Sequence, residues 1–292
     1  MLTLQHLREN AKQVKEGLEK RGFSDLHLVD EVLERDSQRR QLQSDLDNVL
    51  AEINRISKTI GGLYQQGKRN EAEVLKKEVV LKKDSAKSLE ENLKNVERDL
   101  EGVLVRLPNV PHESVPHGST AEDNEVVREG GVKAQGKGIP HWEIASRKGI
   151  IDFELGTKIT GSGFPVYVGK GAAFQRALVQ FFLKEAIRAG YTEYIPPLMV
   201  TDASAFGTGQ LPDKDGQMYV TREEGFFLIP TAEVPVTNIY RDSILAVEQL
   251  PVKMTAYTPC FRREAGSYGK DVRGLNRLHQ FDKVEIVQIV RP

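Results

Sequence analysis

Two stretches near the end of the printed sequence carry the side chains best suited to chemistry. The stretch "CFRREAG" (260–266) follows a run typical of a buried strand, and "LHQFDKVEIVQIV" (278–290) is typical of a second strand. Because alternate residues of an extended chain share a face, Arg262 and Glu264 are expected to lie together while Arg263 points away. One face of the later stretch carries His279, Phe281, Lys283 and Glu285. If the two strands pair antiparallel, that face holds an arginine, two carboxylates and an aromatic ring, a set that a core would exclude.

These side-chain types suit a ligand that is charged and planar. An arginine fork matches phosphate or carboxylate oxygens, a phenylalanine ring stacks on a nucleobase, and a carboxylate receives an ammonium group. Together they favour a nucleotide bound beside an amino acid, and the three glycines of "AGSYGKDVRG" (265–274) allow a loop long enough to fold over a ligand. The alternative is a solvated β-hairpin with incidental charges. His279 shares the ligand face but has no assigned role, and we expect it to be structural.

The elements that must position this face lie in residues 143–292. The stretch 172–190 predicts an amphipathic helix that ends at Gly190. Its apolar side is formed by Phe174, Leu178, Phe181 and Ile187. Strands are predicted in "YTEYIPPLMV" (191–200), "GFFLIP" (225–230) and "MTAYTPCF" (254–261), besides the later stretch. Long connections between strands predict an α+β fold with a mixed, mostly antiparallel sheet.

The first part of the chain follows a different pattern. Apolar residues recur in alternating steps of four and three, first at Leu42, Leu46, Val49, Ile53, Ile56, Ile60 and Leu63, and again from Leu75 to Leu107 with Lys82 at one seam position. The intervening "GGLYQQGKRN" (61–70) holds Gly61, Gly62 and Gly67. Two coiled-coil helices joined by a glycine-rich turn predict an antiparallel hairpin. The alternative is oligomerisation through one long coiled coil.

Charge is unevenly distributed along this predicted arm. Residues 55–87 contain nine Lys or Arg and four Asp or Glu, a net of +5, whereas residues 88–107 contain three basic and five acidic residues, a net of −2. A basic far end suits contact with a phosphate backbone. It is also typical of a solvated coiled-coil face, so the charge pattern leaves both interpretations open.

Length and composition set the wider limits. The sequence has 292 residues, enough for two domains, and we expect a helical arm (1–107), a Pro- and Gly-rich linker (108–142) and a second domain (143–292). Lys plus Arg (41) nearly balances Asp plus Glu (42), so whole-chain charge does not indicate a partner. A single cysteine, Cys260, excludes internal disulfides, and no metal site is predicted. No signal-peptide core and no membrane-length apolar run is present, which predicts a cytoplasmic protein without membrane contact.

Specific motifs extend this interpretation. The stretch "TPCFRREAGSYGKDVRGLNRLHQFDKVEIV" (258–287) resembles motif 2 of the class II aminoacyl-tRNA synthetases. Together with "TGQLP" (208–212), "IPTAEVPVTN" (229–238) and the N-terminal helical hairpin, it resembles the bacterial seryl-tRNA synthetase family. The stretch "GYTEYIPPLMV" (190–200) is similar to motif 1, through which such enzymes form homodimers.

The resemblance implies roles for individual residues. Arg262 is expected to bridge the ATP α-phosphate and the serine carboxylate, Arg263 and Glu264 to contact ATP, and Phe281 to stack on adenine. The "TAE" segment, Thr231, Ala232 and Glu233, is expected to line the serine pocket with Arg262 and Glu285. Glu285 would hold either the amino or the hydroxyl group of the substrate. The implied reaction makes seryl-adenylate from serine and ATP and transfers the seryl group to tRNA(Ser), which the helical arm grips; tRNA(Sec) is left open as a second partner.

The sequence departs from the family pattern at its end. Family members continue beyond "VQIVRP" (287–292) with a segment that holds Mg²⁺ and the ATP phosphates and with motif 3. We therefore expect the sequence to be a truncated form, with magnesium ligands in the missing part. Two alternatives remain: a catalytically incomplete fragment that only binds tRNA through its arm, and a class II enzyme for another amino acid.

Overall fold

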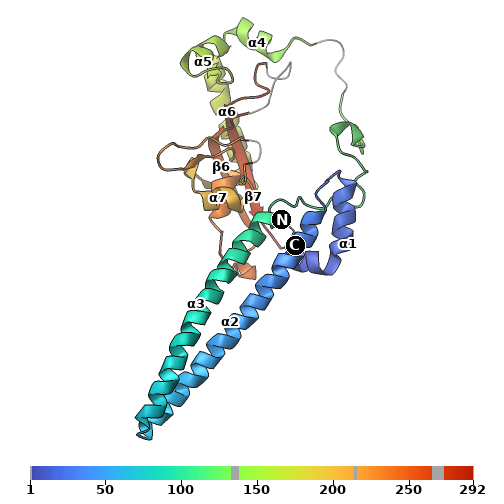
Figure 1. The fold of residues 1–292 in the computed structure, drawn as a ribbon. Coiled ribbons are helices and arrows are strands. Elements are labelled where there is room, and N and C mark those ends of the chain that lie inside the picture. The colour runs from blue at the N-terminus through green and yellow to red at the C-terminus, as the bar shows by residue number, and fades with distance from the viewer. Residues whose placement is uncertain (1, 133–137, 214–215, 265–272, 292) are drawn as a thin grey trace. The chain divides into compact units, whose positions relative to one another are not determined.

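The computed structural model describes residues 2–132, 138–213, 216–264 and 273–291, which form two compact units, Met1–Val132 and Lys133–Pro292. The first unit is helical (Figure 1). Its elements are α1 (Leu4–Lys20), α2 (His27–Gln65), α3 (Arg69–Leu104) and the short 3₁₀ helix η1 (Ala121–Asp123). The Thr3 hydroxyl caps α1 by accepting the His6 N–H at 3.2 Å.

Helices α2 and α3 form the expected antiparallel hairpin (Figure 1). Their seam buries the predicted heptad positions Leu46, Ile53, Ala86 and Leu93, with Leu42, Val49, Val79 and Leu89 packed against them. Lys82, the one charged seam position, forms an ion pair with Glu52 of the opposite helix. The seam therefore holds the hairpin together through leucine, isoleucine and alanine contacts along its length.

The turn of the hairpin is shorter than the sequence predicts. Helix α2 continues through Gly61 and Gly62 to Gln65, so the prediction of a break beginning at Gly61 is wrong. Of the three glycines in this turn, only Gly67 adopts a left-handed conformation, with φ of 77°. Packing along the seam carries the helix through two glycines that alone would weaken it.

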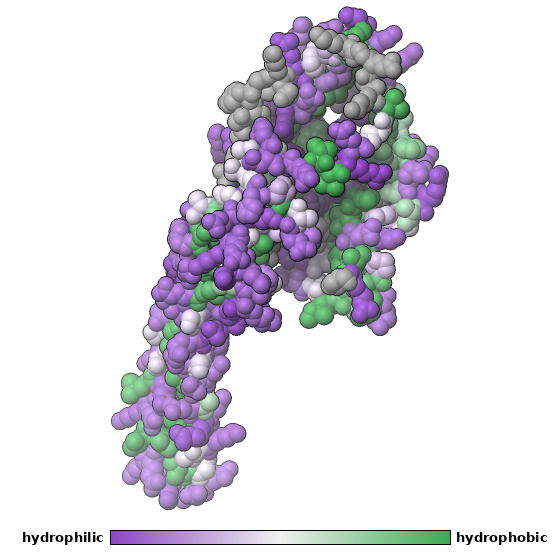
Figure 2. All heavy atoms as spheres, turned by 90° about the vertical axis from the view of Figure 1, so that its right-hand side faces the viewer, coloured by the Kyte–Doolittle hydropathy of each residue, from purple (hydrophilic) through white to green (hydrophobic). Residues whose placement is uncertain are grey.

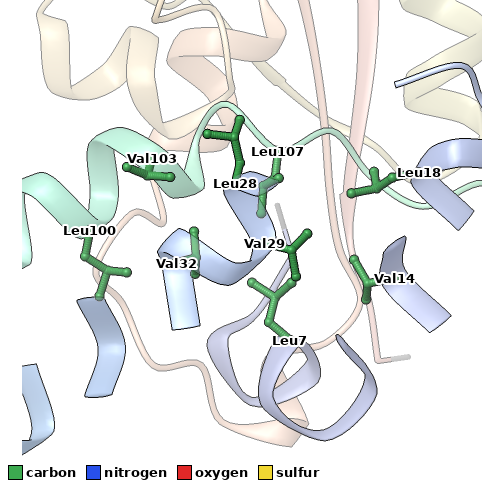
Figure 3. Close-up of a cluster of buried hydrophobic side chains, with 9 residues drawn as sticks. All are labelled: Leu7, Val14, Leu18, Leu28, Val29, Val32, Leu100, Val103 and Leu107. Carbon is green, nitrogen blue, oxygen red and sulfur yellow. The ribbon is translucent and has the colours of Figure 1, made fainter. Parts of the chain in front are cut away.

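At the base of the hairpin, α2 and α3 pack against α1 as well as against each other. A cluster of buried apolar side chains joins the three helices (Figure 3). Its members are Leu7, Val14 and Leu18 of α1, Leu28, Val29 and Val32 of α2, Leu100 and Val103 of α3, and Leu107. The buried carboxylate of Asp36 adds a polar link, because Arg8 of α1 and Arg40 of α2 approach its Oδ2 atom at 3.5 and 3.4 Å.

The segment after α3 returns along α1. Val110 packs against Gly17, the Lys20 ammonium donates to the Glu113 carbonyl at 2.7 Å, and the Arg21 guanidinium donates to the Asn109 carbonyl at 2.7 Å. Residues 109–113 thus lie on the helical unit.

Two glycine substitutions test these contacts as a matched pair. Gly61→Ala is expected to stabilise the hairpin by about 0.5–1 kcal/mol, because alanine restricts the unfolded chain and favours helix, and a Cβ there meets nothing within 4 Å. Gly17→Ala in α1 is expected to destabilise the helical unit by about 1–3 kcal/mol through overpacking, because its Cβ would stand 2.3 Å from Val110 Cγ1. Urea unfolding followed by circular dichroism at 222 nm measures both; equal losses in the two variants would contradict the path of α2 through Gly61.

The second unit is α+β. Its elements in chain order are α4 (His141–Lys148), β1 (Ile151–Asp152), α5 (Phe153–Ile159), β2 (Val166–Tyr167), α6 (Lys170–Arg188), β3 (Thr192–Tyr194), β4 (Met199–Val200), α7 (Asp202–Gly207), β5 (Phe227–Leu228), α8 (Glu233–Asn238), the 3₁₀ helix η2 (Val247–Gln249), β6 (Val252–Phe261) and β7 (Gln280–Ile289). The main sheet has the order β3-β6-β7, in which β3 runs parallel and β7 antiparallel to β6. Two further antiparallel pairs, β1–β2 and β4–β5, make the whole mixed and mostly antiparallel, as predicted.

Helices cover the two faces of the β6–β7 pair. On one face, Met254 and Ala256 of β6 are buried with Ala232 and Val236 at α8. On the other face, Asp282 of β7 accepts a hydrogen bond from Gln175 of α6 and one from the Tyr257 hydroxyl at 2.6 Å. Burial and Asp282 raise the pKa of Tyr257 to about 12, so this phenol stays a donor at neutral pH.

Helix α6 ends where the sequence predicts, followed by Gly190 with φ of 86°. The apolar residues expected on one side of it, Phe174, Leu178, Phe181 and Ile187, are between 40% and 64% exposed. Within the described ranges, no helix has the length and apolar character needed to cross a membrane.

Candidate active site

The ends of β6 and β7 place Arg262 and Phe281 side by side. Cys260 pairs with Phe281 and Phe261 with Gln280, and the Arg262 N–H extends the ladder by donating to the His279 carbonyl at 2.9 Å. The Arg262 guanidinium carbon lies 5.1 Å from the centroid of the Phe281 ring. This cation–π geometry puts a fixed positive charge and an aromatic face at one position, which suits an anionic group attached to a planar base.

Further along the same face, a hydroxyl, an ammonium and a carboxylate meet. The Thr231 hydroxyl donates to Glu285 Oε2 at 2.6 Å, and the Lys283 ammonium lies 3.0 Å from Thr231 Oγ1 and 2.5 Å from Glu285 Oε2. The Thr231 hydroxyl also accepts the Glu233 N–H at 3.2 Å, and Thr231 is only 4% exposed. The Thr255 hydroxyl donates to the Glu285 carbonyl at 2.8 Å. These bonds orient a carboxylate for a ligand ammonium or hydroxyl.

The three residues of "TAE" therefore have different surroundings. Thr231 contacts the polar cluster, Ala232 is fully buried among Val236, Met254 and Ala256, and Glu233 is exposed at the start of α8. Of the three, Thr231 is the one whose side chain the structure brings to Glu285.

Arg263 and Glu264 lie beyond the end of β6. The Arg263 N–H donates to the Gln217 carbonyl at 2.8 Å, and its side chain is exposed. Glu264 has φ of 46°, and its carboxylate, 13% exposed, lies 3.6 Å from the Arg277 guanidinium. The alternation argument does not hold for Glu264, because the chain is no longer extended there. Most of the predicted loop 265–274 lies outside the described residues.

His279 fixes the start of β7 through contacts that the sequence does not reveal. Its ring stacks on Phe164 with centroids 5.1 Å apart, and its Nδ1 atom is 2.7 Å from the Tyr219 hydroxyl. The His279 N–H donates to the Gly163 carbonyl at 2.9 Å. A Cβ on Gly163 would stand 2.5 Å from the His279 ring. In the sequence, the glycines of "TGSGF" (160–164) are the feature that could have indicated a close approach of another side chain, here His279.

Two further findings concern Cys260 and metal ligands. The Cys260 thiol is fully buried, and this burial raises its pKa, which disfavours a nucleophilic thiolate. Among the residues that the structure describes, no group of three or more His, Cys, Asp or Glu is placed to hold a metal ion. The guanidinium, ring, hydroxyl and carboxylate gathered on this face have the chemistry to bind and orient a charged ligand.

The fold is that of a class II aminoacyl-tRNA synthetase. The model of the tRNA synthetase class II core domain (G, H, P, S and T) matches residues 218–292, and that of the seryl-tRNA synthetase N-terminal domain matches residues 1–111. The serine–tRNA ligase of Salinibacter ruber is 49% identical over 294 residues, which is 100% of this chain and 69% of the relative. That of Solibacter usitatus is 47% identical over 295 residues, with 69% of it covered. The chain belongs to the seryl-tRNA synthetase family.

Solved structures agree with this assignment. Seryl-tRNA synthetase from Pyrococcus horikoshii, complexed with ATP, superposes with a TM-score of 0.82 at 31% identity, over 98% of this chain and 69% of that one. The cytoplasmic serine–tRNA ligase from Naegleria fowleri, in complex with AMP, gives a TM-score of 0.78 at 28% identity, over 99% of this chain and 67% of that one. The chain thus spans about 69% of the length of its curated relatives.

Proposed function

We propose that this chain activates serine with ATP to form seryl-adenylate and transfers the seryl group to tRNA(Ser). The observation that carries the proposal is the order of groups along one face of β7. Phe281 with Arg262 comes first, and Glu285 with Thr231 lies four residues further on. Four residues of strand span roughly 13 Å, a distance suited to an adenylate with its base at one end and its amino acid at the other.

In this function each group has one task. Adenine stacks on Phe281, and Arg262 lies between the α-phosphate and the serine carboxylate, with Arg263 and Glu264 toward ATP. Thr231 and Glu285 hold the serine ammonium and hydroxyl groups, and the family resemblance assigns Glu233 to the pocket wall. Ala232, which the resemblance also implies, is fully buried with Val236, Met254 and Ala256 and contributes packing. The roles of Arg263, Glu264, Ala232 and Glu233 are those that the family resemblance implies, whereas the roles of Arg262, Phe281, Thr231 and Glu285 are also supported by the contacts described above.

The chemistry requires positioning more than proton transfer. A serine carboxylate oxygen attacks the α-phosphorus, the bond to the bridging oxygen breaks, and pyrophosphate leaves. A terminal ribose hydroxyl of the tRNA then attacks the acyl carbon, and AMP leaves. Arg262 stabilises the negative charge that develops at phosphorus, as fixed cations do in phosphoryl transfer generally.

ATP is a substrate here, and we propose that it arrives with Mg²⁺ on its phosphates. The residues that the structure describes provide no metal-binding cluster, so we assign no magnesium ligand to them. Phosphate oxygens and water can supply most of the octahedral shell that this ion prefers.

The hairpin of α2 and α3 is proposed to bind the tRNA. Residues 55–87, around its tip, carry a net charge of +5, which suits a phosphate backbone. Figure 2 shows a largely hydrophilic surface along the hairpin, with hydrophobic patches toward its far end. Exposed apolar side chains in that part are Tyr64, Val74, Val80 and Leu81. They can pack against ribose and base surfaces while the lysines meet phosphates.

A second candidate function is tRNA binding without activation. It is favoured by the helical unit, Met1–Val132, which has its own buried clusters and is therefore a compact unit by itself. Binding of tRNA without amino-acid activation would support this second function over the first.

We also propose a cytoplasmic homodimer. Its interface would use motif 1, where Ile195 is 91% exposed, and the preceding helix α6, where Phe174 and Phe181 are 64% and 56% exposed. Apolar side chains grouped in this way are typical of an interface. Sedimentation equilibrium at twice the chain mass is the expected result, and a monomer at micromolar concentration would contradict it.

Amino-acid-dependent ATP–pyrophosphate exchange tests the main proposal. Serine should support exchange, whereas alanine should be rejected, because Thr231 and Glu285 would lose a partner for their buried polar groups. Exchange with another amino acid in place of serine would overturn the substrate assignment. Filter binding and charging with tRNA(Ser) test the transfer step, and the same assay with tRNA(Sec) tests that second partner.

A further inference from the structure

Lys283 is a charged residue of the site face that the proposed function leaves without a task. It lies between Phe281 and Glu285 in the alternation of β7, and it faces Thr258 of β6. Its ammonium nitrogen is 2.5 Å from Glu285 Oε2 and 3.0 Å from Thr231 Oγ1. An ammonium group therefore already sits on the hydroxyl and the carboxylate assigned to the substrate.

The same carboxylate oxygen receives both donors. Glu285 Oε2 accepts the Thr231 hydroxyl and the Lys283 ammonium. A substrate ammonium that approached this oxygen would meet a like charge at close range, which is unfavourable in a partly desolvated site. The Lys283 side chain is 34% exposed, and its flexible four-carbon stem lets the ammonium leave while the backbone stays paired with β6.

We propose that Lys283 is a placeholder cation in the amino-acid pocket, an inference that rests on the proposed function. In the free chain its ammonium occupies the position of the substrate ammonium on Glu285 and Thr231. The substrate ammonium displaces it, and the Lys283 ammonium moves toward Phe281. In the proposed function adenine lies at Phe281 and the serine ammonium at Glu285. The negatively charged serine carboxylate and α-phosphate lie between these two ends, and therefore on the Phe281 side of Glu285. Lys283 forms no covalent bond in this exchange.

This exchange of partners makes the pocket selective for ligands that carry two charges. An amine without a carboxylate must displace Lys283 and offers it no anion in return. An amino acid displaces Lys283 and then pairs its own carboxylate with the released ammonium. Free amines are thereby disfavoured relative to serine, beyond the contribution of direct contacts to Glu285 and Arg262.

Two serine fragments separate the two halves of this inference in the 292-residue chain. Ethanolamine keeps the ammonium and hydroxyl groups, and 3-hydroxypropionate keeps the hydroxyl and carboxylate groups. Replacing Lys283 by methionine, which keeps the length and removes the charge, is expected to tighten ethanolamine binding about fivefold, near the upper value of a partly exposed ion pair. The same variant should bind 3-hydroxypropionate more weakly. Titrations followed by NMR give both dissociation constants.

A merely structural lysine predicts a different pattern. If Lys283 only held Glu285 in place, Lys283→Met would weaken the binding of both fragments. Ethanolamine binding that is weaker or unchanged in a folded Lys283→Met chain overturns the inference. Lys283→Gln, a second neutral variant, provides the same comparison if the methionine variant does not fold by circular dichroism.

Two control variants test whether the effect depends on the positive charge of Lys283 and on its position on the site face. Lys283→Arg keeps a cation and should bind ethanolamine within about twofold of wild type, since the ion pair persists. Lys253→Met removes a lysine from the other face of β6, where it lies over Tyr191, and should change neither affinity. A wild-type chain that binds no serine overturns the proposed function together with this inference, whereas serine binding with unaltered ethanolamine affinity in Lys283→Met overturns the inference alone.

Discussion

Replacing Arg262 by alanine is expected to reduce serine-dependent ATP–pyrophosphate exchange by at least about 100-fold, the effect of removing one preorganised donor at a developing charge, or about 3 kcal/mol. Arg262 is held at two points, by its backbone bond to His279 and by the Phe281 ring under its guanidinium. Its position is therefore set before the substrates bind. We expect most of the loss in kcat, because the charge at phosphorus is greatest in the transition state.

The matched control is Arg222→Ala, which removes an exposed arginine of the same unit and should leave exchange unchanged. Arg262→Lys should recover only part of the activity, since an ammonium cannot bridge phosphate and carboxylate as a fork does. ATP binding by the 292-residue Arg262→Ala chain should remain measurable, because the Phe281 ring is retained. Near-normal exchange in Arg262→Ala would remove Arg262 from the reacting centre.

The parts of the fold that follow a periodic pattern were accessible from the sequence. The heptad steps predict the seam of α2 and α3, and Leu46, Ile53 and Leu93 are buried in it. Alternation along 278–290 predicts that Phe281, Lys283 and Glu285 share a face, and β7 is extended over its whole length. Periodicity works here because a strand or helix repeats one geometry, so spacing alone determines direction.

Alternation fails where the backbone leaves that geometry. Glu264 follows Arg262 by two residues, yet its left-handed conformation ends the extended chain and turns its carboxylate to Arg277. The prediction for Gly61 and Gly62 fails in the opposite sense, because a turn was predicted and a helix is present. Packing along the seam stabilises that helix despite the low helix propensity of glycine. Both cases depend on tertiary context, which a local pattern does not contain.

Contacts between distant segments were also beyond the sequence. Nothing in the spacing of residues brings Gly163 and Tyr219 to His279, or α1 to the base of the hairpin. The contact of Lys283 with Thr231, 52 residues apart, likewise depends on how α8 meets the sheet. Local sequence patterns therefore identify residues of this site, whereas tertiary packing determines which of them contact one another.

Glu285→Gln is expected to raise the KM for serine roughly 30- to 150-fold, because a charged hydrogen bond to the substrate is worth about 2–3 kcal/mol. The amide keeps the size of the carboxylate and can still accept the Thr231 hydroxyl, so the fold should persist. The ATP KM should change little, since the Phe281 ring is distant along β7. The control Glu248→Gln alters an exposed carboxylate in η2 and should have no effect on either constant.

The same variant also determines whether Lys283 acts through Glu285. In the free chain the Lys283 ammonium is held by this carboxylate, so Glu285→Gln releases it before any ligand arrives. The gain in ethanolamine affinity expected for Lys283→Met should then disappear in the double variant, because nothing is left to displace. Residues that act independently would show the full gain in both backgrounds, whereas directly contacting residues give a coupling energy in a double-mutant cycle. An additive cycle would separate Lys283 from Glu285 and leave the carboxylate as the sole ammonium site of the pocket.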